Sequence, residues 1–193
     1  MPNPNQAALD FLLTRRSRPA KLMQPPVPGR ADLHPILTAA ARSPDHGKLE
    51  PWRFIVLERA ALLRLAGAVD ARARDLGLDA EKTAKGRGQF ADGHLAVVVV
   101  ASPKPSDKIP QIEQTLSAGA VCLSLLNAAL AAGWAANWLS GWPSHDAVWC
   151  AGALGLAPHE TVAGIVHIGT VAAADVPDRP RPDLDAITTW VAG

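Results

Sequence analysis

Residues 114–145 read QTLSAGAVCLSLLNAALAAGWAANWLSGWPSH and carry no Asp, Glu, Lys or Arg. A run of this length exceeds the roughly 18 apolar residues that indicate a membrane-spanning helix. Small and polar residues interrupt the run, however, and no cluster of Lys or Arg flanks it to set an orientation. We therefore predict a central core helix over residues 109–132 and a strand over residues 134–140, with a membrane-associated protein as the less favoured alternative.

The composition of the whole chain is that of a globular protein. It has 193 residues, of which 48% are hydrophobic, and a net charge of +1. This charge balance provides no broad basic surface, so nucleic acid is not an expected partner. Cys122 and Cys150 lack the spacing of a zinc site, and the N-terminus lacks the basic-then-apolar layout of a secretion signal. We expect one cytoplasmic domain over residues 1–193, with no metal and no membrane partner.

Predicted helices and strands alternate along the chain. Apolar periodicity predicts helices over residues 5–16, 31–42, 60–76, 79–90, 109–132 and 144–154. Apolar and β-branched runs predict strands over residues 51–58, 94–102, 134–140 and 161–170. The proline-rich stretches 17–30 and 176–182 are expected to be connections, and residues 184–191 a last strand or helix. This order indicates an α/β or α+β layered domain.

Three arginines and a serine, Arg15, Arg16, Ser17 and Arg18, follow the first predicted helix. Guanidinium groups bind phosphate oxygens through paired hydrogen bonds, and a serine hydroxyl adds a donor. The segment is therefore a candidate phosphate site. The alternative is a solvated helix end, where positive charge is favourable in any case.

Arg42, Asp45 and His46 lie on a proline-containing turn between a predicted helix and a predicted strand. Loops positioned by rigid elements commonly carry binding residues, although a charged surface turn is an equal alternative. A hydrolase that uses Asp45 and His46 is disfavoured because no activated nucleophile is apparent.

Tryptophans are concentrated in residues 134–142, WAANWLSGW, directly after the predicted central helix. Such a stretch can form a wall for a flat ring, but tryptophans more often fill a core or an interface. The histidines show no H-x-H or H-x-x-x-H pairing, so a metal site would have to be assembled from distant segments.

Taken in order, these clusters resemble the nitroreductase family, the FMN-dependent homodimeric α+β oxidoreductases. The likeness consists of RRS at 15–17, R-x-P-D-H at 42–46 with PWRF at 51–54, and W-x-S-G at 138–141, and it extends from about Ala8 to Gly169. It implies a three-layer α/β/α domain with a mostly antiparallel sheet. It also implies that the long central helix lies at a dimer interface.

The resemblance assigns roles to particular residues. It implies that Arg15, Arg16 and Ser17 bind the FMN phosphate and ribityl chain, that Arg42 and His46 contact the same flavin, and that Trp138, Leu139 and Ser140 line its site. It aligns Ala128, Ala129, Leu130, Ala131, Ala132 and Gly133 with a region of nicotinamide dinucleotide binding. No catalytic acid or base is implied, because the flavin itself carries the hydride.

The implied activity is two-electron, ping-pong hydride transfer from NADH or NADPH, through FMN, to nitroaromatic, quinone or related conjugated acceptors. Similar proteins have Arg where this chain has Leu139, so flavin affinity is expected to be lower unless Arg18 compensates. Leu139 thereby motivates the alternative of a non-catalytic flavin- or nucleotide-binding module. Residues 71–93 are expected to form a substrate lid.

Overall fold

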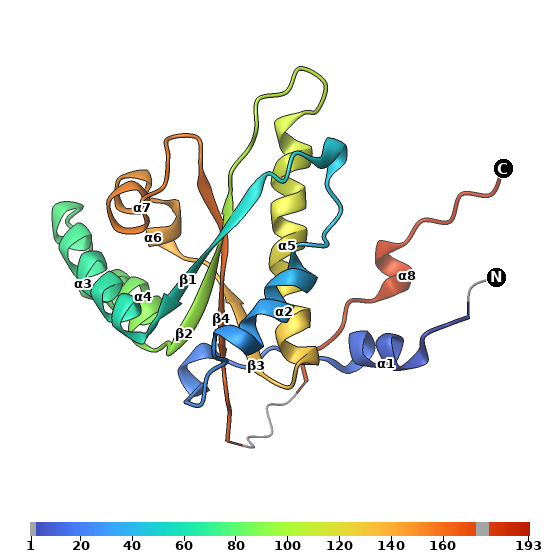
Figure 1. Cartoon of the computed structure of the whole chain (residues 1–193), viewed down its shortest axis with the longest axis horizontal. Helices are drawn as coiled ribbons and strands as arrows, with labels where there is room; N and C mark the ends of the chain where they lie inside the picture. Colours follow the sequence, from blue (N-terminus) through green and yellow to red (C-terminus); the bar gives the residue numbers. More distant parts are fainter. Residues whose placement is uncertain (1–2, 173–177) are drawn as a thin grey trace.

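The centre of the protein is a four-stranded antiparallel sheet with strand order β1-β2-β4-β3 (Figure 1). The structure is a computed structural model that describes residues 3–172 and 178–193. The strands are β1 (Trp52–Glu58), β2 (Leu95–Ala101), β3 (Ala135–Leu139) and β4 (Thr161–Gly169). Each of the four strands begins within one residue of the first residue predicted for it.

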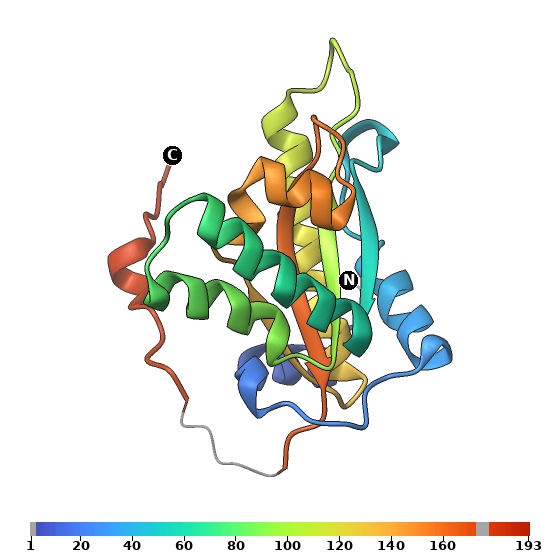
Figure 2. The same ribbon diagram turned by 90° about the vertical axis from the view of Figure 1, so that its left-hand side faces the viewer.

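Helices cover both faces of the sheet, as Figures 1 and 2 show from two directions. One face carries α2 (Arg30–Ala40) and α5 (Gln111–Ala131), and the other carries α3 (Arg59–Asp75), α4 (Ala80–Ala91), α6 (Trp142–His145) and α7 (Ala147–Leu154). Successive residues of β2 alternate between the two hydrophobic cores, with Val97 and Val99 in one and Val98 and Val100 in the other. The expected three-layer α+β arrangement is confirmed.

The charge-free run forms α5 and β3. Val121, Cys122 and Leu125 of α5 are fully buried against the sheet, whereas Leu116 is 65% exposed and Leu123 is 45% exposed. Among the described residues, α5 is the one helix that is long and apolar enough to cross a membrane, and 44% of its most apolar stretch is buried inside the protein. It therefore has one core face and one apolar face that no described residue of the chain covers.

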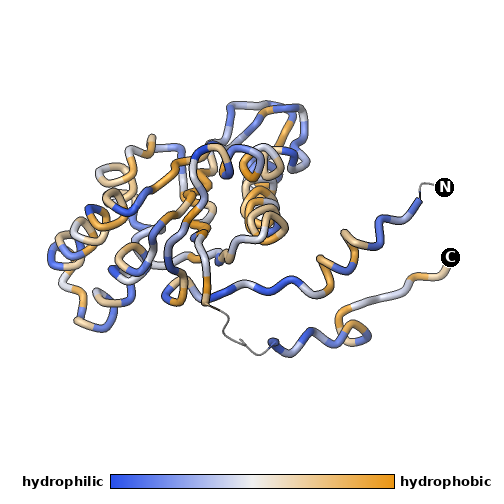
Figure 3. Tube along the Cα trace, turned by 60° about the horizontal axis from the view of Figure 1, so that its bottom comes forward, coloured by the Kyte–Doolittle hydropathy of each residue, from blue (hydrophilic) through white to orange (hydrophobic). Residues whose placement is uncertain are grey.

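Both ends of the chain extend away from the body. Helix α1 (Gln6–Thr14) and the short α8 (Leu184–Ile187) bury no residue, and Figure 3 shows hydrophobic stretches along both of these segments. Trp190 is 90% exposed. The connection between α1 and α2 contains one short 3₁₀ turn, Ala20–Leu22, and a second 3₁₀ turn, His46–Lys48, precedes β1.

Two predicted elements differ from the structure. Instead of one helix over residues 144–154, the chain forms α6 and α7, which meet at Asp146. Ser144 and Asp146 were both expected to begin the predicted helix. The Asp146 carboxylate accepts a hydrogen bond of 2.6 Å from the backbone N–H of Trp149 and caps α7. Only residues 184–187 of the predicted last element are helical. The proline-rich tail expected over 176–182 begins outside the described residues.

An ion pair joins β1 to the turn before β4. Arg53 donates two hydrogen bonds of 2.7 Å to the Glu160 carboxylate, and the backbone N–H of Ala157 donates a third of 3.0 Å. The hydrogen bonds from Arg53 are the main reason that the pKa of Glu160 falls from its usual 4.5 to about 2. Glu160 therefore stays charged in the folded protein over a pH range in which it is protonated in the unfolded chain.

We expect Glu160→Gln to destabilise the protein near neutral pH and to have a smaller effect in acid. Because the folded pKa lies below the unfolded pKa, the contribution of Glu160 is complete above about pH 4.5 and is lost as the pH falls towards 2. Urea unfolding of both proteins over a pH series measures the difference. His167, whose pKa burial lowers to about 4, titrates in both proteins and cancels. A difference that does not depend on pH would contradict the prediction.

Candidate functional site

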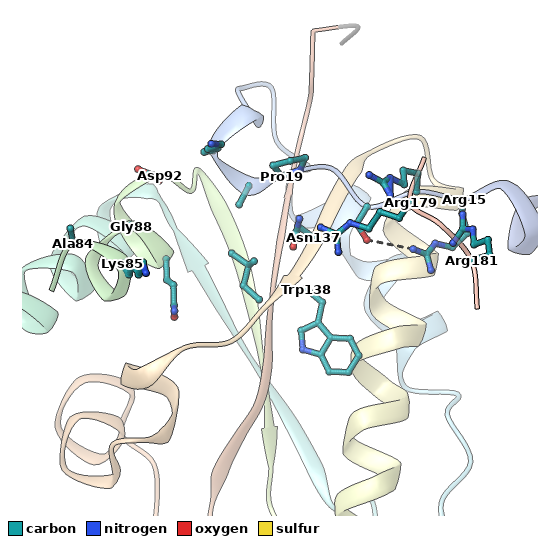
Figure 4. A pocket seen from close by; sticks show the side chains of 16 residues that line it. Arg15, Pro19, Ala84, Lys85, Gly88, Asp92, Asn137, Trp138, Arg179 and Arg181 are labelled. Carbon is teal, nitrogen blue, oxygen red and sulfur yellow. Dashed lines mark hydrogen bonds between the residues drawn. The ribbon is translucent and has the colours of Figure 1, made fainter. Parts of the chain in front are cut away.

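A pocket of about 880 Å³ lies between the two ends of the chain and α4. Arg15 and Arg16 reach it from the connection after α1, and Arg179 and Arg181 reach it from the C-terminal tail. Figure 4 shows Arg15, Arg179 and Arg181 gathered on one side of the pocket, with α4 on the other. Four guanidinium groups at one end make this end suitable for an anion.

The backbone around the arginines is held against β3. The N–H of Arg15 donates to the Phe11 carbonyl at 2.7 Å and ends α1. The N–H of Arg18 donates to the Ala136 carbonyl at 3.0 Å, and the Asn137 side-chain amide donates to the Arg18 carbonyl at 2.8 Å. These bonds position the side chains of the segment before any ligand binds.

The arginines have unused hydrogen-bonding capacity. A guanidinium Nη of Arg15 contacts the Ser17 hydroxyl at 3.4 Å, and Arg16 lies 3.6 Å from the Asp178 carboxylate. The Nε–H groups of Arg15 and Arg16 are buried and have no hydrogen-bond partner among residues 3–172 and 178–193. A buried donor without a partner is costly, which indicates that an anionic ligand completes this site.

Helix α4 forms the opposite wall with residues spaced on one face, namely Ala84, Lys85, Gly88, Gln89 and Asp92. The Gln89 side chain occupies the space that a Cβ would need at Gly141, and its Oε1 is buried without a partner. Residues 71–93, expected to be a substrate lid, thus contribute a wall of the pocket.

Hydrogen bonds from other elements hold α4 in place. The Trp142 indole donates to the Lys82 carbonyl at 3.0 Å, and the Arg59 guanidinium donates to the Ala91 carbonyl at 2.6 Å. The Asp79 side chain caps the start of the helix by accepting from the backbone N–H of Lys82 at 2.7 Å. The wall is therefore fixed at its beginning and at its end.

The structure brings together five of the predicted site residues, and these line the large pocket: Arg15, Arg16, Ser17, Trp138 and Leu139. The indole of Trp138 packs over Gly164, where a Cβ would collide with it, and lies beside α5 in Figure 4. Ser140 is not among the lining residues, and its hydroxyl instead contacts His145 Nε2 at 2.9 Å.

His46 lies at the opposite end of α5, and Ser43, the neighbour of Arg42, bonds Ser124 in the middle of that helix. The His46 ring is 2.6 Å from the Glu113 carboxylate in the first turn of that helix. Leu130, in the last turn, lines a pocket together with Arg15. Glu113 and Leu130 are about 25 Å apart at 1.5 Å per residue. His46 therefore does not reach the large pocket of its own chain, and Arg42 is not among the residues that line it.

The structure places the residues of the predicted dinucleotide region, 128–133, in different surroundings. Ala129 is fully buried in the core, so no ligand reaches its side chain. Ala131 and Ala132 are exposed, and Ala128 packs partly against the core. Leu130 and Gly133 line a second pocket of about 340 Å³, which Arg15, Arg16 and Arg18 also line. Arg18 is absent from the lining of the large pocket, so it does not replace the arginine missing at Leu139.

Nucleophilic or metal chemistry is poorly supported by the described part of the chain. Burial raises the pKa of the Cys122 thiol to about 12 and that of Cys150 to about 11, which keeps both protonated. Burial lowers the pKa of His167 to about 4 and keeps it neutral. The described residues contain no group of three His, Cys, Asp or Glu side chains that could hold a metal ion.

Several pocket residues were missed because their signal in the sequence is weak. Lys85 and Gln89 sit on a charged helix with weak periodicity, and only their spacing of four residues hints at a common face. Arg179 and Arg181 alternate with prolines in the tail, which favours an extended backbone that exposes both side chains. That alternation is the signal that could have identified them.

Comparisons with known proteins identify the family and the fold of the chain. The model of the nitroreductase family matches residues 12–170. A Haemophilus influenzae protein named "Putative NAD(P)H nitroreductase" is 37% identical over 174 residues, which cover 84% of this chain and 88% of that protein. The crystal structure of a nitroreductase-like family protein from Bacillus cereus superposes with a TM-score of 0.80 at 19% identity and full coverage of both chains.

A crystal structure from Desulfovibrio desulfuricans, described as a nitroreductase in complex with FMN, superposes with a TM-score of 0.72 at 20% identity. It covers 100% of this chain and 99% of that one. Such low identities establish the fold alone, whereas the family match spans most of the sequence. The chain therefore belongs to the nitroreductase family.

Proposed function

We propose that the chain is a single FMN-binding domain that uses NADH or NADPH to reduce nitroaromatic, quinone or related conjugated acceptors. The observation that carries this proposal is the pair of buried, unpartnered Nε–H groups of Arg15 and Arg16 at one end of the large pocket. Membership of the nitroreductase family supports it. So do a relative named as an NAD(P)H nitroreductase and a protein of the same fold crystallised with FMN.

The residues of the pocket fit FMN at both of its ends. A phosphate needs several donors, which Arg15, Arg16 and Ser17 offer together with the tail arginines. The polar edge of a flavin ring carries an N–H group, which needs an acceptor. The unpartnered Oε1 of Gln89, on the opposite wall, is such an acceptor. The volume of about 880 Å³ is in the range of ligand pockets.

Bound FMN would supply hydride acceptance and hydride donation. Arg15 and Arg16 hold the anionic end, and α4 keeps Lys85 and Gln89 at the opposite wall. The positive charge of the lining would stabilise negative charge on a bound, reduced flavin. Hydride transfer itself needs no general base, so the absence of an acid–base dyad among the lining residues is compatible with this activity.

A second candidate function is a non-catalytic flavin- or nucleotide-binding module. Leu139 favours it, because this half-buried residue lines the pocket where similar proteins have an arginine. Arg179 and Arg181 line the same pocket, and Arg179 offers a guanidinium group in its place, whereas Arg181 donates two hydrogen bonds of 3.0 Å to the Asp178 carboxylate. For that reason the enzyme is the better supported of the two functions.

We further propose that the protein is a homodimer that acts in the cytoplasm. Leu116 and Leu123 form an exposed apolar face on α5, and Trp190 is almost fully exposed on the extended tail. An obligate dimer interface is about as apolar as a protein core and would cover these surfaces. A second copy could also supply Arg42 and His46 to a pocket that they do not reach within one chain. The two cysteines are buried and unpaired, which suits a reducing compartment.

The proposed function is tested on the purified protein. We expect a preparation with the absorption bands of a flavin, or one that gains them when FMN is added, and elution as a dimer. We also expect oxidation of NADH or NADPH when a quinone or a nitroaromatic compound is present. A colourless protein that takes up no FMN would refute the proposal, and FMN uptake without nicotinamide oxidation would identify the binding module instead.

A further inference from the structure

His167 lies in the interior of the protein, on the face of β4 that also carries Ile165 into the core beneath α3 and α4. It is 1% exposed, and neither of its ring nitrogens has a hydrogen-bond partner among the described residues. Buried polar atoms without partners destabilise a fold, and an apolar side chain of similar size would avoid that cost. A histidine at this position therefore needs an explanation other than packing.

The last turn of α4 leaves one backbone carbonyl without its usual donor. In an α-helix each carbonyl accepts from the N–H four residues later, so the Gln89 carbonyl would accept from Gly93. The Gly93 N–H instead donates to the Phe90 carbonyl at 3.3 Å. The Arg59 guanidinium donates to the carbonyls of Ala91 and Gly93 at the same helix end. The Gln89 carbonyl thus depends on a side chain from another element for its donor.

The Gln89 carbonyl lies beside the His167 ring. Burial lowers the pKa of His167 to about 4, and this backbone carbonyl acts in the opposite direction. Gly93 permits the close approach, because a Cβ there would lie 2.5 Å from His167 Nδ1. The neutral ring carries one N–H and needs one acceptor. A donor without an acceptor and a carbonyl without its usual donor are therefore adjacent.

Gln89 connects this pair of groups to the large pocket. Its side chain lines the pocket from α4. Asn137 of β3 lines the pocket as well, and it is directly opposite His167 in the pairing of β3 with β4. Opposite residues of antiparallel strands project from the same face and lie side by side. His167 therefore borders a residue of each of the two pocket walls.

We propose that His167 is a positioning residue: its ring N–H bonds the Gln89 carbonyl in the flavin-loaded protein and so holds the Gln89 side chain against the flavin ring. This inference rests on the proposed function, because it assumes that the large pocket binds a flavin. His167 itself touches no ligand. The ring and the carbonyl are already adjacent, so little ordering is needed to complete the bond.

Two substitutions of His167 test the role through the binding of riboflavin and FMN, measured by titration of flavin fluorescence. His167→Leu removes the N–H and should weaken both flavins by the same factor, about three- to ten-fold, because one neutral hydrogen bond is lost and the phosphate is not involved. His167→Gln keeps an N–H donor and should bind both flavins nearly as the wild-type protein does.

Val98→Ala is the matched control. Val98 is fully buried in the same core and does not line the pocket. Its truncation should lower the melting temperature and leave both flavin affinities unchanged. His167→Leu should show the reverse, because leucine removes the buried polar atoms and keeps the core filled.

NMR of protein with labelled histidine and glutamine observes the bond itself. In the flavin-loaded protein, a correlation through the hydrogen bond should join a ring nitrogen of His167 to the carbonyl carbon of Gln89. It should be absent from His167→Leu, which identifies the signal. Absence of this correlation from the loaded wild-type protein would overturn the proposal.

The binding results separate the remaining outcomes. Unchanged flavin affinity in His167→Leu would overturn the proposal. Equal losses of affinity and of melting temperature in His167→Leu and His167→Gln would also overturn it, since that result is expected of a ring that only fills space. A wild-type protein that binds neither flavin would refute the proposed function, and this inference with it, whereas normal binding by both wild type and His167→Leu would refute this inference alone.

Discussion

Arg16→Ala should weaken FMN binding by about ten- to hundred-fold and leave riboflavin binding nearly unchanged. A hydrogen bond to a charged group contributes about 1.5 to 3 kcal/mol, which corresponds to this range of affinity. Arg16 also lies 3.6 Å from the Asp178 carboxylate. Its removal would leave a negative charge close to the phosphate, so the effect should lie towards the upper end. Riboflavin has no phosphate and should not respond.

Titration of flavin fluorescence measures both affinities in the same experiment. Arg15→Ala should behave in the same way, and the double variant should lose less than the sum of the two single effects, because neighbouring arginines share one ligand. Arg74→Ala removes an exposed arginine far from the pocket and serves as the matched control. Equal losses for FMN and riboflavin, or no loss for FMN, would refute a phosphate-binding role.

Phe90→Ala should lower the free energy of unfolding by about 3 to 5 kcal/mol, the usual cost of removing a buried phenyl ring. Phe90 is 0% exposed, and its ring centroid lies 5.0 Å from that of Trp149 in the core between α4 and α7. Gln89, the preceding residue of α4, lines the large pocket. A loosened α4 should therefore weaken riboflavin as well as FMN, unlike the arginine variants.

Urea unfolding of Phe90→Ala measures the loss, with Leu63→Ala as the control because Leu63 is 47% exposed on α3. Phe90→Leu keeps most of the buried volume and should cost much less than the alanine variant. A loss below about 1 kcal/mol for Phe90→Ala would show that the core around α4 is not packed as described.

The strands were predictable because their burial leaves a simple pattern. Val97 to Val100 form an uninterrupted apolar run, and the structure buries that run between two helical layers. The break at Asp146 was not predicted. The residues on both sides of Asp146 have helical composition. The break depends on the Asp146 carboxylate, which caps α7 and also accepts a hydrogen bond from Arg72 of α3. Contacts between distant segments are not visible in local periodicity.

The large pocket was predictable only in part, for the same reason. Arg15, Arg16 and Ser17 form a local cluster with recognisable phosphate chemistry, and Leu139 lies in a short motif. Gln89 has no such signal. Its significance comes from its buried and unpartnered carbonyl oxygen and from its position against Gly141, more than 50 residues away in the sequence.

By itself, the sequence determined the three-layer fold, the central helix and the membership of the nitroreductase family, because periodicity and ordered motifs are properties of the chain. Only the tertiary structure decided which cations share a pocket. Arg15 and Arg179 lie near opposite ends of the sequence and line the same pocket, whereas Arg18 lines a different one. His46 lies at the far end of α5. Charges act through distance in space, and that distance is set by packing rather than by sequence separation.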